Sequence, residues 1–184
     1  MSPLRFEPAP EVTVDDRVFK RFLRYPVARE FEGAVAENAT WAREWFSQNG
    51  RPWLVAIEAD ETIQQLCAAI WPKAPRLGVI IASAGAEAEL AAAAYWEKDE
   101  PDRYYFLECF SSAVVDELLT QTRDSLGAKK HYCPGYPDWS IAENIPLLAA
   151  IKNAVELPRP LESLDSGMLT PKKSQIAVFE LPQT

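Results

Sequence analysis

A long run of helical periodicity between Asp102 and Leu126 limits the architectures open to this chain more than any other segment. Apolar and small residues recur on one face of it, at Leu107, Ser111, Val114 and Leu118. The Ser111-Ser112 pair leaves room for another backbone to approach closely, and Gly127 marks the end of the pattern. We therefore expect a buried central helix around which the other elements pack.

Shorter helical and strand patterns flank this helix. Helical periodicity predicts helices over residues 14–23, 28–48, 61–70, 84–96 and 140–153, and short apolar runs predict strands over 53–57 and 77–82. The proline-containing residues 1–12 predict an extended arm. Two β-rich segments, Leu161–Met168 and Ser174–Leu181, predict a C-terminal β-hairpin. The expected architecture is one α+β domain over residues 1–184, with a mixed or antiparallel sheet and long core helices.

The composition argues against several classes of protein. The chain has 19 Lys and Arg against 27 Asp and Glu, a formal net charge of −8, and no basic run longer than two residues. This charge argues against nucleic-acid binding and suits a basic protein partner better. No apolar window approaches the roughly 18 residues of a membrane span, and the N-terminus lacks an apolar signal region. We expect a cytoplasmic protein that does not bind membranes.

Cysteine and histidine are too few for the common metal sites. The three cysteines are odd in number and lack Cys-x-x-Cys spacing, and His131 is the single histidine. We expect reduced thiols at Cys67, Cys109 and Cys133. The sequence supports neither a metal site nor an assigned catalytic residue.

A densely specified loop follows the central helix. Lys129–Trp139 holds two prolines, one glycine and three aromatic residues, a composition that disfavours regular structure. We expect an irregular loop with a functional role.

Four blocks of the sequence, in order, resemble the reactivation domain of cobalamin-dependent methionine synthase. The blocks are a strand with a glycine and an acidic helix start, a long helix with a small-residue pair and then an acidic residue, a Pro-Gly-Tyr loop, and a closing hairpin. They are Gly78–Glu87, Arg103–Leu118, His131–Trp139 and Leu161–Ser174. The resemblance implies a C-shaped or helmet-shaped α+β domain with S-adenosylmethionine in a shallow groove.

The resemblance also implies a role in repairing a corrinoid cofactor. In that family, an electron from a flavodoxin-type reductant and a methyl group from S-adenosylmethionine return inactive cob(II)alamin to methylcobalamin, and the domain contributes positioning. This sequence has no Asp-x-His-x-x-Gly cobalamin motif. We therefore expect cobalamin to arrive on a partner, either a corrinoid-binding protein or a methionine synthase without its own activation domain.

The family's S-adenosylmethionine contacts match six residues of this chain: Asp116, His131, Cys133, Pro134, Gly135 and Tyr136. Gly135 would allow close backbone approach and Tyr136 would supply an aromatic wall, with backbone groups at Cys133 and Gly135 facing the adenine and ribose. The Asp116 carboxylate would hold the ammonium or sulfonium charge. The alternative for Asp116 is a solvated helix flank.

His131 departs from the family pattern, which has arginine three positions before the proline. Arginine is a fixed cation with a two-pronged contact to a carboxylate, whereas histidine titrates near neutrality. The alternative for His131 is a loop histidine hydrogen-bonded to the backbone, and Trp139 is expected to be a packing anchor for the loop.

Three hypotheses about function follow. The first is an accessory protein that binds S-adenosylmethionine and reactivates a corrinoid methyltransferase. The second is a non-catalytic binding or scaffold protein that kept the fold and lost this ligand. The third, ranked last, is a hydrolase or transferase using Cys133 or Cys109 with His131, because a histidine two residues from a cysteine in an irregular loop is poorly placed as its base.

Overall fold

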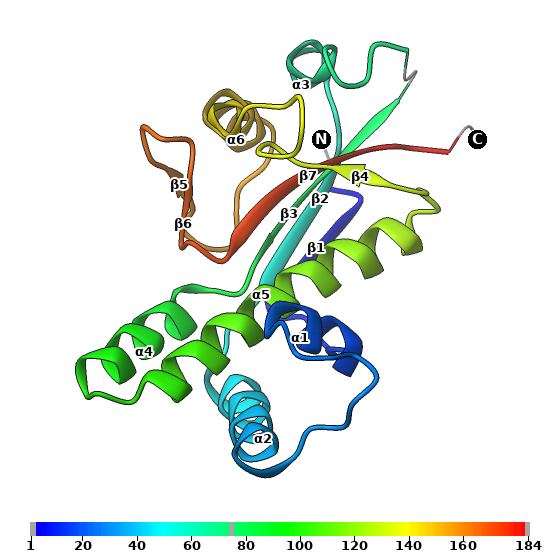
Figure 1. The fold of residues 1–184 in the computed structure, drawn as a ribbon. Coiled ribbons are helices and arrows are strands. Elements are labelled where there is room, and N and C mark those ends of the chain that lie inside the picture. The colour runs from blue at the N-terminus through cyan, green and yellow to red at the C-terminus, as the bar shows by residue number, and fades with distance from the viewer. Residues whose placement is uncertain (1–2, 74–75, 183–184) are drawn as a thin grey trace.

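The computed structural model describes residues 3–73 and 76–182, which build a five-stranded antiparallel sheet (Figure 1). The strand order is β1-β2-β3-β7-β4. The bounds are β1 Arg5–Glu7, β2 Trp53–Glu58, β3 Leu77–Ser83, β7 Ser174–Glu180 and β4 His131–Tyr132. A separate two-stranded sheet pairs β5 (Glu162–Ser163) with β6 (Leu169–Thr170).

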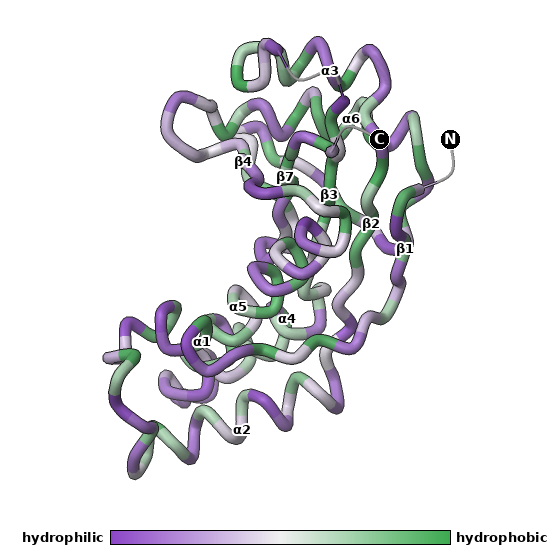
Figure 2. Tube along the Cα trace, turned by 90° about the vertical axis from the view of Figure 1, so that its right-hand side faces the viewer, coloured by the Kyte–Doolittle hydropathy of each residue, from purple (hydrophilic) through white to green (hydrophobic). Residues whose placement is uncertain are grey.

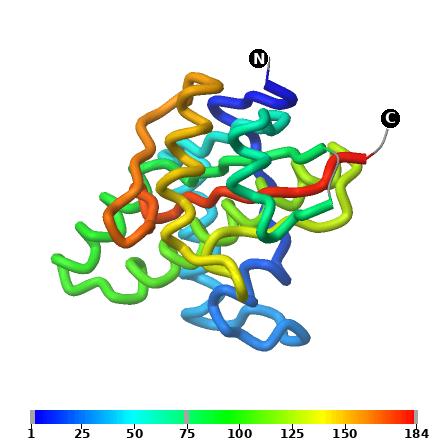
Figure 3. The backbone as a smooth tube through the Cα atoms, turned by 90° about the horizontal axis from the view of Figure 1, so that it is seen from above, coloured from blue at the N-terminus to red at the C-terminus, as the bar shows by residue number. Residues whose placement is uncertain are grey.

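Helices cover both faces of the main sheet (Figures 1 and 3). On one face lie α1 (Asp16–Phe22), α2 (Gly33–Asn49), α4 (Ala86–Glu97) and α5 (Pro101–Ser125). On the other face lie α3 (Glu61–Cys67) and α6 (Asn144–Ala154), the latter preceded by a 3₁₀ turn at Ile141–Glu143. Within residues 3–73 and 76–182, none of these helices is both long and apolar enough to span a membrane.

The strands divide their side chains between two hydrophobic clusters. In β2, Leu54 and Ala56 join the cluster under α5, whereas Trp53, Val55 and Ile57 join the cluster under α6. This alternation follows from the two-residue repeat of a strand. Because both faces are covered, the central strands are apolar along their length, as the hydropathy colours of Figure 2 show. The fold is therefore the α+β class that the sequence predicts.

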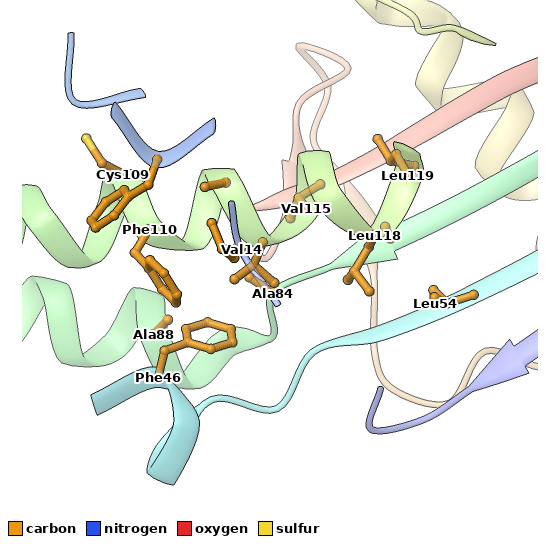
Figure 4. Packing of buried hydrophobic residues seen from close by; sticks show 14 of the residues in the cluster. Val14, Phe46, Leu54, Ala84, Ala88, Cys109, Phe110, Val115, Leu118 and Leu119 are labelled. Atoms are coloured by element: carbon orange, nitrogen blue, oxygen red, sulfur yellow. The ribbon is translucent and has the colours of Figure 1, made fainter. Parts of the chain in front are cut away.

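Helix α5 occupies the central position expected of it. Pro101 stands at its start, Asp102 in its first turn and Arg123 in its last, an arrangement that complements the helix dipole. The predicted inner face is buried at Leu107, Ser111, Val114 and Leu118. In Figure 4, Phe110 of α5 packs toward α2, where its ring centroid lies 5.5 Å from that of Phe46.

Three predictions about β-structure need correction. Arg5–Glu7, in the expected arm, forms β1 by pairing with β2. His131 and Tyr132, in the expected irregular loop, form β4 on the edge of β7. The C-terminal hairpin exists with other partners, since β5 pairs with β6 while β7 enters the main sheet between β3 and β4. Such pairings depend on distant residues, so local sequence patterns do not reveal them.

Candidate functional site

The Pro-Gly-Tyr loop is a tight bend held by its own backbone. The Tyr136 amide donates to the Cys133 carbonyl at 3.0 Å, the Trp139 amide to the Tyr136 carbonyl at 3.1 Å, and the Gly135 amide to the Trp139 carbonyl at 2.8 Å. Gly135 has a φ of +94°, a conformation that side-chain-bearing residues rarely adopt. The bend is therefore specified by backbone geometry, and the side chains around it are free for other contacts.

Strand β4 sends its two side chains to opposite faces of the sheet. His131 lies opposite Phe179, a member of the cluster under α5, and therefore faces α5. Tyr132 lies opposite Val178 and faces α6, where its ring stacks on that of Trp139 with centroids 6.3 Å apart. Trp139 is only 5% exposed, which agrees with its expected role as a packing anchor.

Cys133 is fully buried among the predicted site residues. Its thiol contacts the side chains of Tyr136 and Gln175, and Asp116 of α5 lies near enough to act on it electrostatically. Burial raises the pKa of the Cys133 thiol to about 12. A thiol that stays protonated at neutral pH is a poor nucleophile, which counts against a cysteine hydrolase. Burial likewise raises the pKa of the Cys109 thiol.

Asp116 lines a cavity of about 210 Å³ between α5, the end of α1 and the start of β7. Its carboxylate Oδ2 lies 2.7 Å from Nη2 of Arg21, and its side chain is 34% exposed. Gln175 lines the same cavity and also contacts the Cys133 thiol. Gln175 thus joins the cavity at Asp116 to the Pro-Gly-Tyr bend, and Pro134 is buried beside it in the chain while Tyr136 is 39% exposed.

This cavity is smaller than most ligand pockets, which measure roughly 300–1,000 Å³. Polar residues, Ser112, Asp116, Lys172, Lys173 and Gln175, share its lining with the apolar Phe22 and Val115. A lining of this kind can hold a small charged group.

His131 is half-buried and uncharged at neutral pH. Burial, followed by the positive charge of Arg123, lowers its pKa, while Asp116 and Asp124 oppose that shift. Among the residues that the structure describes, none hydrogen-bonds to the buried Nδ1 of His131. His131 therefore offers no fixed cation where the resemblance implies arginine.

Sequence reasoning missed two residues beside this site, Arg21 and Gln175. Arg21 lies 95 residues from Asp116, in an amphipathic helix where a basic residue in the last turn needs no special explanation. Gln175 lies in β7, which the sequence predicts as half of a C-terminal hairpin and which pairs instead with β3 and β4. Both become neighbours of Asp116 only through the packing of α1 and β7 against α5.

A larger cavity, of about 390 Å³, lies at the start of α4. Trp53, Leu90, Arg159 and Pro171 are among its lining residues. It contains none of the six residues that the resemblance identifies. Arg159 in its wall is engaged by Glu87, with Nη1 to Oε1 at 2.9 Å.

Comparison with known proteins identifies the fold. No protein-family model matches the sequence, and no curated protein matches it. Among solved structures, the crystal structure of the MetH reactivation domain bound to AdoHcy superposes with a TM-score of 0.61 at 12% sequence identity, covering 93% of this chain and 75% of that one. An identity this low is evidence about the fold alone. The chain therefore has the fold of the MetH reactivation domain.

Proposed function

We propose that this protein binds S-adenosylmethionine between α5 and the Pro-Gly-Tyr bend and presents its methyl group to a corrinoid carried by a partner. The observation that carries the proposal is the position of Gln175, which joins the polar cavity at Asp116 to Cys133 and Tyr136. The solved domain of the same fold has AdoHcy bound, and AdoHcy is what remains of S-adenosylmethionine after methyl transfer.

The protein's part in this reaction is to bind and orient the ligand. A corrinoid on the partner would supply the methyl acceptor after one-electron reduction by a flavodoxin-type donor, and the sulfonium of S-adenosylmethionine would leave as the neutral thioether of S-adenosylhomocysteine. Tyr136 would stack against the nucleoside, and Asp116 would hold the ammonium group. Both residues act by position, so neither has to exchange a proton.

Binding can be tested by titration calorimetry with S-adenosylmethionine and S-adenosylhomocysteine. We expect Tyr136→Ala to weaken both by about tenfold or more, because a stacked aromatic face contributes on the order of 1–3 kcal/mol per base. Phe6→Ala is the matched control, since Phe6 is an exposed aromatic residue at the opposite edge of the sheet. Absence of binding to the wild-type protein at millimolar ligand would exclude the proposal.

Transfer can be tested with a corrinoid protein, a reductant and methyl-labelled S-adenosylmethionine. The expected result, only when this protein is present, is methylcobalamin in the absorption spectrum together with label in the isolated cobalamin, measured by scintillation counting. If the protein binds S-adenosylmethionine but transfers no methyl group to any of several corrinoid proteins, the proposed transfer is wrong and the protein is a ligand-binding module with another partner.

A second candidate function is a binding or scaffold protein that no longer takes the ligand. The observation that favours it is the ion pair between Arg21 and Asp116, which occupies the carboxylate assigned to the ligand ammonium. A flat thermal-shift response to both nucleosides would support this candidate.

A further inference from the structure

The Asp116 carboxylate is held by an arginine that no motif of the sequence singles out. Arg21 extends from the last turn of α1, and its Nη2 lies 2.7 Å from Oδ2 of Asp116 on α5. The guanidinium also lies over the ring of Phe22, 5.4 Å from the centroid, and Phe22 lines the cavity next to Asp116. Arg21 lies next to this cavity, since its partner Asp116 and its neighbour Phe22 both line it, and 60% of its side chain is exposed.

We propose that Arg21 and Asp116 form a clamp for the α-carboxylate and α-ammonium groups of the ligand's amino-acid end, an inference that rests on the proposed function. An α-amino acid carries a cation and an anion on one carbon. It can therefore replace the single Arg21–Asp116 ion pair with two, Asp116 to the ammonium and Arg21 to the carboxylate. An exposed ion pair stabilises a protein only slightly, so opening this one costs the fold little.

The charges around the cavity favour an incoming carboxylate. Lys172 and Lys173 share one acidic partner, with Nζ atoms 2.9 Å and 3.3 Å from the two oxygens of Glu108. Three cations, Arg21, Lys172 and Lys173, are balanced here by Asp116, Glu108 and Glu89, whose Oε2 accepts from the Lys172 amide at 2.8 Å, although the whole chain has a net charge of −8. A carboxylate placed beside Arg21 therefore enters a region that is less negative than the chain as a whole.

The size of the cavity also favours the amino-acid end of the ligand as its occupant. About 210 Å³ is room for an amino-acid group and too little for an added nucleoside. Gln175 continues from the cavity wall to Cys133, so a ligand anchored at Arg21 and Asp116 would extend toward Tyr136.

The clamp explains how the site works without arginine at position 131. Burial and the charge of Arg123 lower the pKa of His131, so this residue is neutral at pH 7 and cannot hold a carboxylate as an ion pair. Arg21 supplies a permanently charged, two-pronged donor from another element. In the clamp, the cation that contacts the carboxylate lies on α1 instead of on the loop, and the contact is still one between a guanidinium and a carboxylate.

The experiment compares two pairs of ligands by titration calorimetry on the full chain: S-adenosylhomocysteine with 5′-methylthioadenosine, both thioethers, and S-adenosylmethionine with its decarboxylated form, both sulfonium ions. S-adenosylhomocysteine has both charged groups, 5′-methylthioadenosine has neither, and decarboxylated S-adenosylmethionine lacks the carboxylate of S-adenosylmethionine. The variants are Arg21→Ala, Arg21→Lys and Asp116→Asn. Arg17→Ala is the matched control, because it removes the same charge from an exposed position one turn earlier in α1.

We expect the wild-type protein to bind S-adenosylhomocysteine at least about tenfold more tightly than methylthioadenosine, as for a hydrogen bond between charged groups. Arg21→Ala should abolish both this preference and the preference for S-adenosylmethionine over its decarboxylated form, without changing the affinity for methylthioadenosine. Arg21→Lys should keep part of both preferences, and Asp116→Asn should weaken every ligand that carries the ammonium group. Arg17→Ala should behave as wild type.

Two results would overturn the clamp while leaving the proposed function intact: an Arg21→Ala protein that still discriminates like wild type, or one that loses methylthioadenosine as severely as S-adenosylhomocysteine. A wild-type protein that binds none of the four ligands would instead reject the proposed function, and the clamp with it. Unchanged circular dichroism of each variant separates these outcomes from loss of the fold.

Discussion

His131 is a half-buried titratable residue at the start of the Pro-Gly-Tyr loop. It lies on an edge strand, faces α5 and has its pKa lowered by burial and by Arg123. Folding therefore favours the neutral imidazole. A neutral imidazole here differs from the fixed cation that the sequence resemblance implies at this position.

The free energy of unfolding should depend on pH through His131. Folding lowers the pKa of His131, so the unfolded chain binds the proton more tightly than the folded one. Protonation of His131 therefore favours unfolding. The stability that the neutral imidazole gives the fold is present above the unfolded pKa of about 6.5 and is lost as the pH falls below that value. Denaturant melts between about pH 7.5 and about pH 5 should show a steeper loss of stability in wild type than in His131→Gln. Because His131 is the single histidine, parallel curves would show that its environment does not perturb it.

Gly78 in β3 is required by the ring packed over it. A Cβ at this position would lie 2.3 Å from Cζ of Phe179, a fully buried residue on the neighbouring strand. Gly78→Ala should therefore lower the free energy of unfolding by about 1–3 kcal/mol through overpacking. Adding Phe179→Leu should make the alanine much less costly in a double-mutant cycle, measured by urea denaturation. Strict additivity would contradict the steric explanation.

At the scale of elements, the junction of α1 with α5 links the fold to the site. Glu117 of α5 is 8% exposed, and its Oε1 accepts a hydrogen bond from the Asp15 amide, 3.1 Å away, at the start of α1. Phe19 of α1 packs edge-on to Phe110 of α5 with centroids 5.0 Å apart. These contacts determine where Arg21, at the other end of α1, meets Asp116.

Glu117→Ala should loosen α1 without unfolding α5. Removing the charged acceptor leaves the Asp15 amide without its partner, a loss of about 1.5–3 kcal/mol. Amide hydrogen exchange should accelerate selectively over residues 15–22, and S-adenosylhomocysteine should bind more weakly because Arg21 is displaced. Gln121→Ala is the control, since this exposed side chain reaches Glu117 and the Thr13 carbonyl only through long contacts of 3.3 Å and 3.4 Å. Uniform acceleration across the sheet would mean that Glu117 supports the whole core instead.

For the whole molecule, two hydrophobic clusters on the two faces of one sheet hold the Pro-Gly-Tyr loop between them. The loop enters both, with Cys133 in the cluster under α5 and Trp139 in the cluster under α6. A ligand bound between the loop and α5 would therefore contact elements from the beginning, middle and end of the chain, and the whole fold should respond to it.

Ligand binding should accordingly stabilise the molecule globally. S-adenosylhomocysteine at about 100 times its Kd should add about 2.7 kcal/mol to the free energy of unfolding, a rise in Tm of roughly 5–10 °C for a chain of this size. ADP, which shares the adenosine group and lacks the amino-acid end, is the control and should shift Tm far less. Equal shifts with the two ligands would indicate that the amino-acid end makes no specific contact.

The sequence by itself determined the helices and the two central strands, because their signals are local. The periodicity of residues 102–126, the proline at the start of α5 and the apolar runs at β2 and β3 depend on neighbours a few positions away. The Pro-Gly-Tyr bend belongs to the same category, since Gly135 and its turn hydrogen bonds are contained within seven residues, 133–139.

Only the tertiary structure decided which strands pair and which side chains share the site. β1, β4 and the placement of β7 depend on partners far along the chain, and the strands at the edge are too short to show a pattern of their own. Arg21 and Gln175 meet around Asp116 because α1 and β7 pack on α5 from opposite ends of the sequence. An ion pair across 95 residues has no local periodicity, so no reading of spacing along the chain could have shown it.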